Sequence, residues 1–218
     1  MLGIMESLVS DALGRVPMQA ADKKAVADVN AQRVKILVVG VGGGGSNTVA
    51  RLHAMGIKSA ETIAINTDRK HLEMIQADRK VLIGAKTTKG MGAGGFPEVA
   101  EKAAEASREQ LANMLGHAEL VFLVAGMGGG TGTGAAPVIA QIAKEQGAIV
   151  VAMVTYPFAL ERARLGKADW GLERLRNTCD TVVIIDNNRL VEYVPNLAVN
   201  KAFAVADTLV ARAVKGLA

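Results

Sequence analysis

A nine-residue run rich in glycine, Gly126 to Gly134 (GMGGGTGTG), limits the folds open to this chain more than any other feature. An apolar stretch, Leu120 to Ala125, precedes the run, and a helical pattern, Ala135 to Lys144, follows it. Glycine lets a backbone adopt positive φ and approach a phosphate closely. The N–H groups of a helix's first turn, together with the helix dipole, favour negative charge. Thr131 and Thr133 add hydroxyl donors. The run therefore predicts an anion site between a strand and a helix, and not a flexible linker.

The same alternation of apolar and helical patterns extends along the chain. Strands are expected at residues 34–39, 62–65, 80–83, 120–125, 148–154 and 181–185. Helices are expected at residues 48–55, 70–76, 97–115, 135–144, 161–176 and 199–217, with a long glycine-bearing loop at 84–97. Such alternation is typical of an α/β fold, here a Rossmann-like, three-layer arrangement of a parallel sheet with helices on both faces. Ligands bind such sheets beyond the carboxyl ends of the strands.

Composition narrows the function classes. Half of the residues are hydrophobic but only 3% are aromatic, so aliphatic side chains must build the core, as in helix-covered parallel sheets. The net charge of +4 comes from basic residues interspersed with acidic ones. A chain with no dense basic block and few aromatic residues for base stacking is not expected to bind nucleic acid.

Cysteine and histidine usage points to a cytoplasmic protein without a metal centre of its own. The single cysteine, Cys179, allows no internal disulfide and suits a reducing compartment. His53, His71 and His117 lie far apart and lack metal-ligand spacing, so no residue is assigned as a metal ligand. The sequence has neither a signal-peptide pattern nor an apolar run of about 18 residues, the length expected of a membrane-spanning helix.

A second glycine run, after the first strand, leaves two classes of nucleotide open. Gly40-x-Gly42-x-x-Gly45 matches the dinucleotide fingerprint, and Asp68 closes the second strand about 20 residues further on. This match alone suggests NAD and an NAD-dependent oxidoreductase. A dehydrogenase has no need of the run at 126–134, however, and two glycine runs on neighbouring strands suit a triphosphate held from both sides. The P-loop pattern G-x-x-x-x-G-K-[ST] is absent.

Several segments, in order along the chain, resemble the tubulin/FtsZ family of GTPases, and its prokaryotic cell-division branch more than tubulin. The resemblance runs from about residue 33 to the end and rests on GVGGGGSN (Gly40 to Asn47), AINTD (Ala64 to Asp68), GAGGFPEV (Gly92 to Val99), GGGTGTG (Gly128 to Gly134), TYPF (Thr155 to Phe158), Glu161, Arg164, Asn187 and AFAVADTL (Ala202 to Leu209).

The resemblance implies a GTP/GDP site, with Mg²⁺ held through the phosphates. Residues implied to hold the α- and β-phosphates are Gly42, Gly43, Gly44, Gly45, Ser46 and Asn47. Residues implied to hold the β- and γ-phosphates are Gly126, Gly128, Gly129, Gly130, Thr131, Gly132 and Thr133, with Ala93 and Gly94 near the γ-phosphate. Residues implied on the ribose side are Glu161 and Arg164, and those at the guanine are Asn187, Phe203 and Asp207; Pro157 is also implied to belong to the site.

Two of these assignments keep an alternative. Asp68 either helps to position Mg²⁺ through water or caps its loop. Between Glu161 and Gly171 the chain is one residue shorter than is usual in the family, so either Arg162 or Arg164 matches the family's arginine.

Elementary chemistry supports the guanine assignment independently. A carboxylate is acceptor-only, so Asp207 can receive the N1–H and the 2-amino group of guanine. Adenine offers neither donor and would leave the buried carboxylate unpaired. Phe203 lies four residues earlier on the same predicted helix and therefore shares a face with Asp207. Its ring either stacks on the base or packs in the core.

The resemblance also divides the chain. Residues 1–32 are expected to form a helical extension, and residues 33–218 a GTP-binding domain that ends in the family's long central helix. In the family a second domain follows, and an acidic loop after that helix completes hydrolysis on the nucleotide of the next subunit. Both are expected to be missing here, so no catalytic residue is assigned and turnover by this chain should be very low.

The full-length protein is expected to be a filament-forming GTPase of prokaryotic cell division. It would self-associate into protofilaments at the division site and reach the membrane only through adaptor proteins. A regulatory sensor that binds the nucleotide without hydrolysing it remains an alternative.

Overall fold

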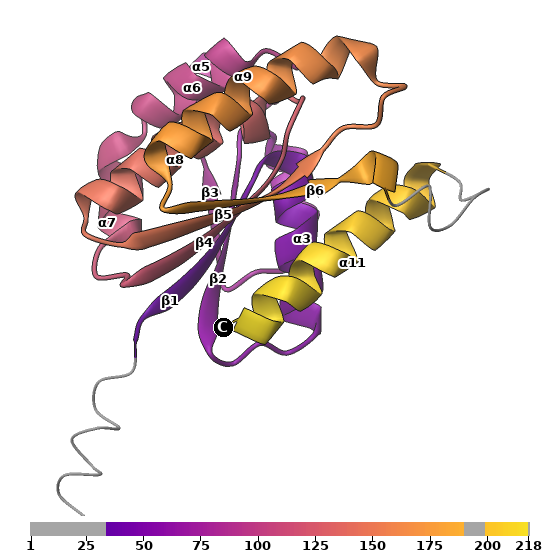
Figure 1. The fold of residues 1–218 in the computed structure, drawn as a ribbon. Coiled ribbons are helices and arrows are strands. Elements are labelled where there is room, and N and C mark those ends of the chain that lie inside the picture. The colour runs from indigo at the N-terminus through magenta and orange to yellow at the C-terminus, as the bar shows by residue number, and fades with distance from the viewer. Residues whose placement is uncertain (1–33, 190–198, 218) are drawn as a thin grey trace, which may run out of the picture. The chain divides into compact units, whose positions relative to one another are not determined.

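The computed structural model describes residues 34–189 and 199–217, and the fold is that of the unit Lys35–Ala218. The expected helical extension, residues 1–32, lies outside the described residues. One parallel sheet of six strands runs in the order β3-β2-β1-β4-β5-β6 (Figure 1). The strands are β1 (Ile36–Val41), β2 (Ala60–Asn66), β3 (Arg79–Leu82), β4 (Leu120–Gly126), β5 (Ile149–Tyr156) and β6 (Thr181–Asp186). The predicted Rossmann-like α/β fold is confirmed.

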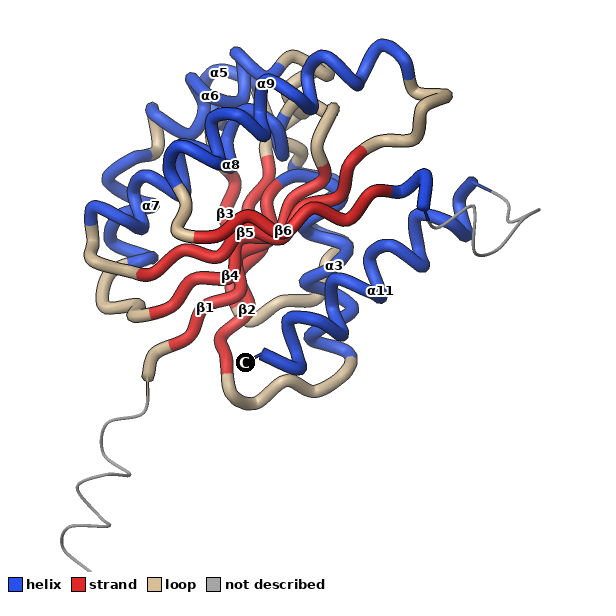
Figure 2. The backbone as a smooth tube through the Cα atoms, in the orientation of Figure 1, coloured by secondary structure: helices blue, strands red, loops and turns tan. Residues whose placement is uncertain are grey.

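Helices cover both faces of the sheet, which makes the three layers expected from the sequence (Figures 1 and 2). The helices are α3 (Gly42–Ala54), α4 (Arg69–Met74), α5 (Ala85–Thr88), α6 (Pro97–Glu105), α7 (Arg108–Leu115), α8 (Thr131–Glu145), α9 (Arg162–Thr178) and α11 (Val199–Leu217). Helices α6 to α9 pack on one face, and α3 and α11 pack against each other and on the opposite face. In residues 34–189 and 199–217, no helix is both long and apolar enough to cross a bilayer.

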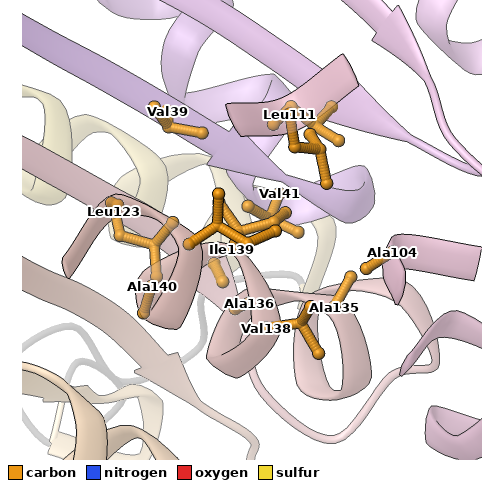
Figure 3. Packing of buried hydrophobic residues seen from close by; sticks show 14 of the residues in the cluster. Val39, Val41, Ala104, Leu111, Leu123, Ala135, Ala136, Val138, Ile139 and Ala140 are labelled. Atoms are coloured by element: carbon orange, nitrogen blue, oxygen red, sulfur yellow. The ribbon is translucent and has the colours of Figure 1, made fainter. Parts of the chain in front are cut away.

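Strand β1 is buried on both faces, which explains its continuous apolar sequence. Val39 and Val41 pack toward α8, whereas Val38 packs toward α3 and α11. Leu123 of β4 and Ile139 of α8 meet β1 in the first of these two layers (Figure 3). Aliphatic side chains thus fill both layers, as the low aromatic content predicts.

Two predictions between residues 84 and 115 are wrong in detail. The glycine-bearing loop contains a short helix, α5, which begins after Gly84 in the left-handed conformation. The single helix expected at 97–115 is two helices, α6 and α7, separated near Ser107. The Ser107 hydroxyl donates to the carbonyl of Ala103 and accepts from the amide of Gly84. Serine that bonds to nearby backbone in this way competes with the helical hydrogen bonds, which explains the break.

The two glycine runs are also more helical than predicted, because α3 begins at Gly42 and α8 at Thr131. Glycine disfavours helices, so packing must outweigh that cost. A Cβ on Gly45 would overlap the carbonyl oxygen of Val124, and a Cβ on Gly134 would overlap that of Pro97. These two glycines therefore allow each helix to pack closely against neighbouring backbone.

The substitution Gly134→Ala should lower the free energy of unfolding by at least about 2 kcal/mol, because the added methyl group overlaps backbone that cannot move freely. Urea unfolding measures this. The matched control is Gly166→Ala on α9, where a Cβ meets nothing within 4 Å, and which should stabilise the protein slightly through helix propensity. A Gly134→Ala variant as stable as the unmodified protein would contradict this account of the packing.

Candidate functional site

A hollow of about 550 Å³ lies at the carboxyl edge of the sheet, where ligands of such folds bind. Segments that follow five of the six strands line it, together with the loop before α6 and one residue of α11. The lining residues are Gly43, Gly44, Asn66, Asp68, His71, Met91, Gly92, Gly94, Gly95, Gly126, Met127, Gly129, Gly130, Thr131, Gly132, Thr155, Pro157, Glu161, Arg164, Asn187 and Phe203.

The beginnings of α3 and α8 lie side by side in the middle of this hollow. Strands β1 and β4 pair in register, Val41 beside Ala125, so their following helices start at the same edge. Gly42 has a φ of 73°, and a Cβ there would come within 2.7 Å of the Gly132 amide nitrogen. Only glycine permits that approach without strain.

Neither helix end is closed by the protein's own side chains. No side chain caps α3 or α8, and neither first turn contains an acidic residue. The Ser46 hydroxyl on α3 is buried without a hydrogen-bond partner among the described residues. The first N–H groups of a helix have no partner inside the helix, so two adjacent uncapped ends form an anion site.

The loop before α6 closes one side of the hollow. Gly94 has a φ of 60°, and Ala93 is buried beside Gly130, where an added Cβ would come within 2.9 Å of the Ala93 methyl group. Lys167 of α9 donates to the Gly95 carbonyl at 2.7 Å and so ties the loop to that helix. The loop is thus held against the glycine run of α8.

Asp68 caps α4, since its Oδ1 accepts from the His71 amide at 3.1 Å. Capping was one of the two roles left open for Asp68. Among the described residues no group of three or more His, Cys, Asp or Glu side chains is placed to hold a metal ion.

In the segment that follows β5, Glu161 and Arg164 form an ion pair of 2.7 Å between Oε2 and Nη1. The other carboxylate oxygen of Glu161 accepts from the Phe158 amide at 3.0 Å. Of the two arginines left open, Arg164 lines the hollow and Arg162, at the start of α9, does not, although both are exposed.

Asn187 and Phe203 form the end of the hollow beyond β6. Asn187 is buried, and its Oδ1 has no hydrogen-bond partner in the described parts of the chain. Phe203 is 37% exposed and meets Phe158 edge-on at 5.2 Å between ring centroids. An exposed aromatic face beside an unsatisfied buried carbonyl suits a heteroaromatic ring with an N–H donor.

Asp207 lies one helical turn beyond Phe203 and does not itself line the hollow. Its carboxylate is loosely held, with Thr48 Oγ1 at 3.4 Å and Arg51 Nε at 3.9 Å. Burial raises the pKa of Asp207 from 3.8 to about 6, and Arg51 and Thr48 oppose this shift only in part. A poorly satisfied carboxylate of this kind can accept further donors from a ligand.

Asp207 should make the stability of the nucleotide-free protein depend on pH. Between about pH 4 and 6 the native carboxyl group is protonated while the unfolded one is ionised, so stability falls as pH rises through this window. The loss is on the order of 2 kcal/mol. Urea unfolding of the unmodified protein and of Asp207→Asn at pH 4.5 and 7.5 measures it: the variant should gain relative stability at pH 7.5. The same difference between the two proteins at both pH values would contradict the assignment.

The predicted residues divide into those that line the hollow and those that do not. The predicted residues outside the lining are Gly42, Gly45, Ser46, Asn47, Ala93, Gly128, Thr133 and Asp207. The sequence reasoning assigned no role to seven other residues of the lining, which are Asn66, His71, Met91, Gly92, Gly95, Met127 and Thr155. Their place at or after the carboxyl end of β2 could have indicated Asn66 and His71, because parallel strands end at a common edge.

A second hollow, of about 530 Å³, lies between α9 and β6. Asp169, Glu173 and Asp186 line it against a single cation, Arg176. This surplus of carboxylates disfavours phosphate binding there.

Known proteins match this chain over most of its length. The family model "Tubulin/FtsZ family, GTPase domain" matches residues 35–195. The chain is 56% identical to cell division protein FtsZ 2 of Methanocaldococcus jannaschii over 98% of this chain and 55% of that protein. It is 51% identical to cell division protein FtsZ 2 of Haloferax volcanii over 98% of this chain and 54% of that one. The chain thus spans about half the length of the curated relatives it matches.

Solved structures with a similar fold come from the same relatives and from further ones. An empty FtsZ dimer from M. jannaschii has a TM-score of 0.87 and 47% identity, covering 92% of this chain and 59% of that one. A GTPγS-bound protofilament of CetZ2 from Haloferax volcanii has a TM-score of 0.72 and 26% identity, covering 84% and 57%.

Proposed function

Because the chain belongs to the tubulin/FtsZ family, within the family's GTPase domain, we propose that the hollow at the carboxyl edge of its sheet binds GTP and GDP. One observation carries the proposal above the others: the uncapped beginnings of α3 and α8 lie side by side there, and Gly42, without a Cβ, permits the close approach to the Gly132 amide. Backbone N–H groups and helix dipoles at that point would bind the phosphates.

The two ends of the hollow supply the rest of a nucleotide site. Asn187, Phe203 and Asp207 would bind guanine at the β6 end, and Glu161 and Arg164 would lie beside the ribose. Mg²⁺ would be held mainly through the phosphates, and Asp68 is the carboxylate that lines the hollow on the β2 side. The ion would neutralise phosphate charge when bound.

The match to the GTPase domain removes the support for an NAD-dependent oxidoreductase.

We propose for the full-length protein the role that the names of its relatives describe: a cell-division GTPase. Self-association into protofilaments, as in the CetZ2 structure, would accompany GTP binding. Hydrolysis would require an acidic loop of the neighbouring subunit to orient the attacking water, a step that depends mostly on positioning and electrostatics. Cytoplasmic location at the division site, and membrane contact through adaptor proteins alone, belong to the same proposal.

Calorimetry with GTP, GDP, ATP and NAD tests the binding proposal directly. GTP and GDP should bind, ATP should bind far more weakly, and NAD should give no heat of binding. Tight binding of NAD without binding of GTP would overturn the proposal. Turnover measured on the full-length protein distinguishes a GTPase from a non-hydrolysing sensor, since a sensor would release no phosphate.

A further inference from the structure

The hollow extends across five neighbouring strands, which fixes where each end of a nucleotide can lie. Its lining runs from Asn187, after β6, to Asp68 and His71, after β2. In the order β2-β1-β4-β5-β6 that is four strand spacings, or roughly 19 Å at ~4.8 Å each. With the base at the β6 end and the helix ends of α3 and α8 in the middle, the third phosphate lies toward β2. A diphosphate bound in this orientation would end before it reached His71.

The orientation of the Asn66 side chain is set by the backbone around it. Its Oδ1 accepts from the amide of Thr67 at 2.8 Å and from that of Asp68 at 3.3 Å. An amide oxygen accepts and an amide nitrogen donates, so the Nδ2 of Asn66 is the atom that faces away from these N–H groups. Asn66 is only 3% exposed, so this arrangement is enclosed by the protein.

Asn66 in turn fixes the tautomer of His71. The Nδ2 of Asn66 lies 3.3 Å from the Nδ1 of His71. Because Nδ2 carries only donors, Nδ1 must accept, and the neutral imidazole then bears its proton on Nε2. The backbone of His71 is anchored as well, through the bond from its amide to Asp68. Nε2 makes no hydrogen bond to any residue of the described chain, and the side chain lines the hollow.

We propose that His71 donates its Nε2–H to the terminal phosphate of a nucleoside triphosphate and thereby makes the hollow prefer GTP to GDP. The inference rests on the proposed function, because it uses the same hollow. Arg164, the other nitrogen donor with a cationic form in the lining, lies at the α9 side. A charge-assisted hydrogen bond to phosphate at the β2 end therefore adds about tenfold or more in affinity for the triphosphate alone.

Two substitutions separate this role from a structural one. Glutamine places its amide nitrogen near the position of Nε2, whereas asparagine reaches only as far as Nδ1. His71→Asn should weaken binding of the slowly hydrolysed analogue GTPγS about tenfold and leave GDP affinity within about twofold. His71→Gln should retain most of the GTPγS affinity. The control is His53→Asn, because His53 lies 3.4 Å from the Thr62 hydroxyl and 3.6 Å from Asp78 and does not line the hollow.

Calorimetry with GTPγS and with GDP, at one Mg²⁺ concentration, gives the ratio of the two affinities for each variant. Equal weakening of both nucleotides by His71→Asn, or no weakening of either, would overturn the role of His71. Failure of the unmodified chain to bind either nucleotide would instead overturn the proposed function. The two failures are distinguishable, because only the second one shows in nucleotide binding by the unmodified chain.

Discussion

Replacing Asp207 with asparagine should collapse the preference of this protein for GTP over ATP. A site that pairs a buried carboxylate with ligand donors rejects an analogue without them by about 10⁴-fold, because the carboxylate is then left unpaired. The partners of Asp207 in the protein, Thr48 at 3.4 Å and Arg51 at 3.9 Å, are distant, and its raised pKa of about 6 reflects that poor compensation. Asparagine can donate as well as accept, so it tolerates adenine better.

Competition binding of GTP and ATP to the unmodified protein and to Asp207→Asn measures this change. The ratio of the two affinities should fall to about 100-fold or less in the variant. The control is Asp169→Asn, which alters a carboxylate of the second hollow and should leave the ratio unchanged. An undiminished GTP preference in Asp207→Asn would remove Asp207 from the guanine site.

A carboxylate placed between the two helix ends should abolish tight nucleotide binding. Gly129 lines the hollow, and a Cβ there meets nothing within 4 Å, so a side chain fits without disturbing the fold. A charge in Gly129→Asp would lie close to the phosphates. Repulsion between two negative charges about 5 Å apart is worth about 3 kcal/mol at a protein surface. GTP and GDP affinities should therefore both fall at least about 100-fold.

Two controls show whether charge is the cause. Gly129→Ala adds the Cβ alone and should retain binding within about threefold. Gly166→Asp adds a carboxylate at another open glycine position, on α9 outside the lining, and should bind as the unmodified protein does. If Gly129→Asp bound GTP as tightly as Gly129→Ala, the phosphates would lie elsewhere.

The sheet and the general position of the site could be predicted because the relevant signals are local. Apolar runs such as 120–125 mark strands buried on both faces. Because strands and helices alternate along the chain, the strands are expected to pair in parallel, as they do. Glycine runs after the first and fourth strands mark where the backbone must approach a ligand. The structure places both at one edge of the sheet.

The details that escaped prediction depend on contacts between distant segments. The helical starts at Gly42 and Thr131 reflect the packing of glycine backbone against strands, which helix propensity does not reveal. The break at Ser107 depends on its bond to Gly84, 23 residues away. His71 gave no motif of its own, because its orientation is set by Asn66 and its place in the site by the end of β2.

The central claim is that a guanine nucleotide lies across the sheet edge, with its phosphates between the beginnings of α3 and α8. A crystal structure of the chain grown with excess GTPγS tests this most directly. The account predicts guanine against Asn187 and Phe203 and the phosphates over Gly43 and Gly129 to Gly132. A nucleotide seated instead between α9 and β6, or a vacant hollow at the carboxyl edge, would contradict it.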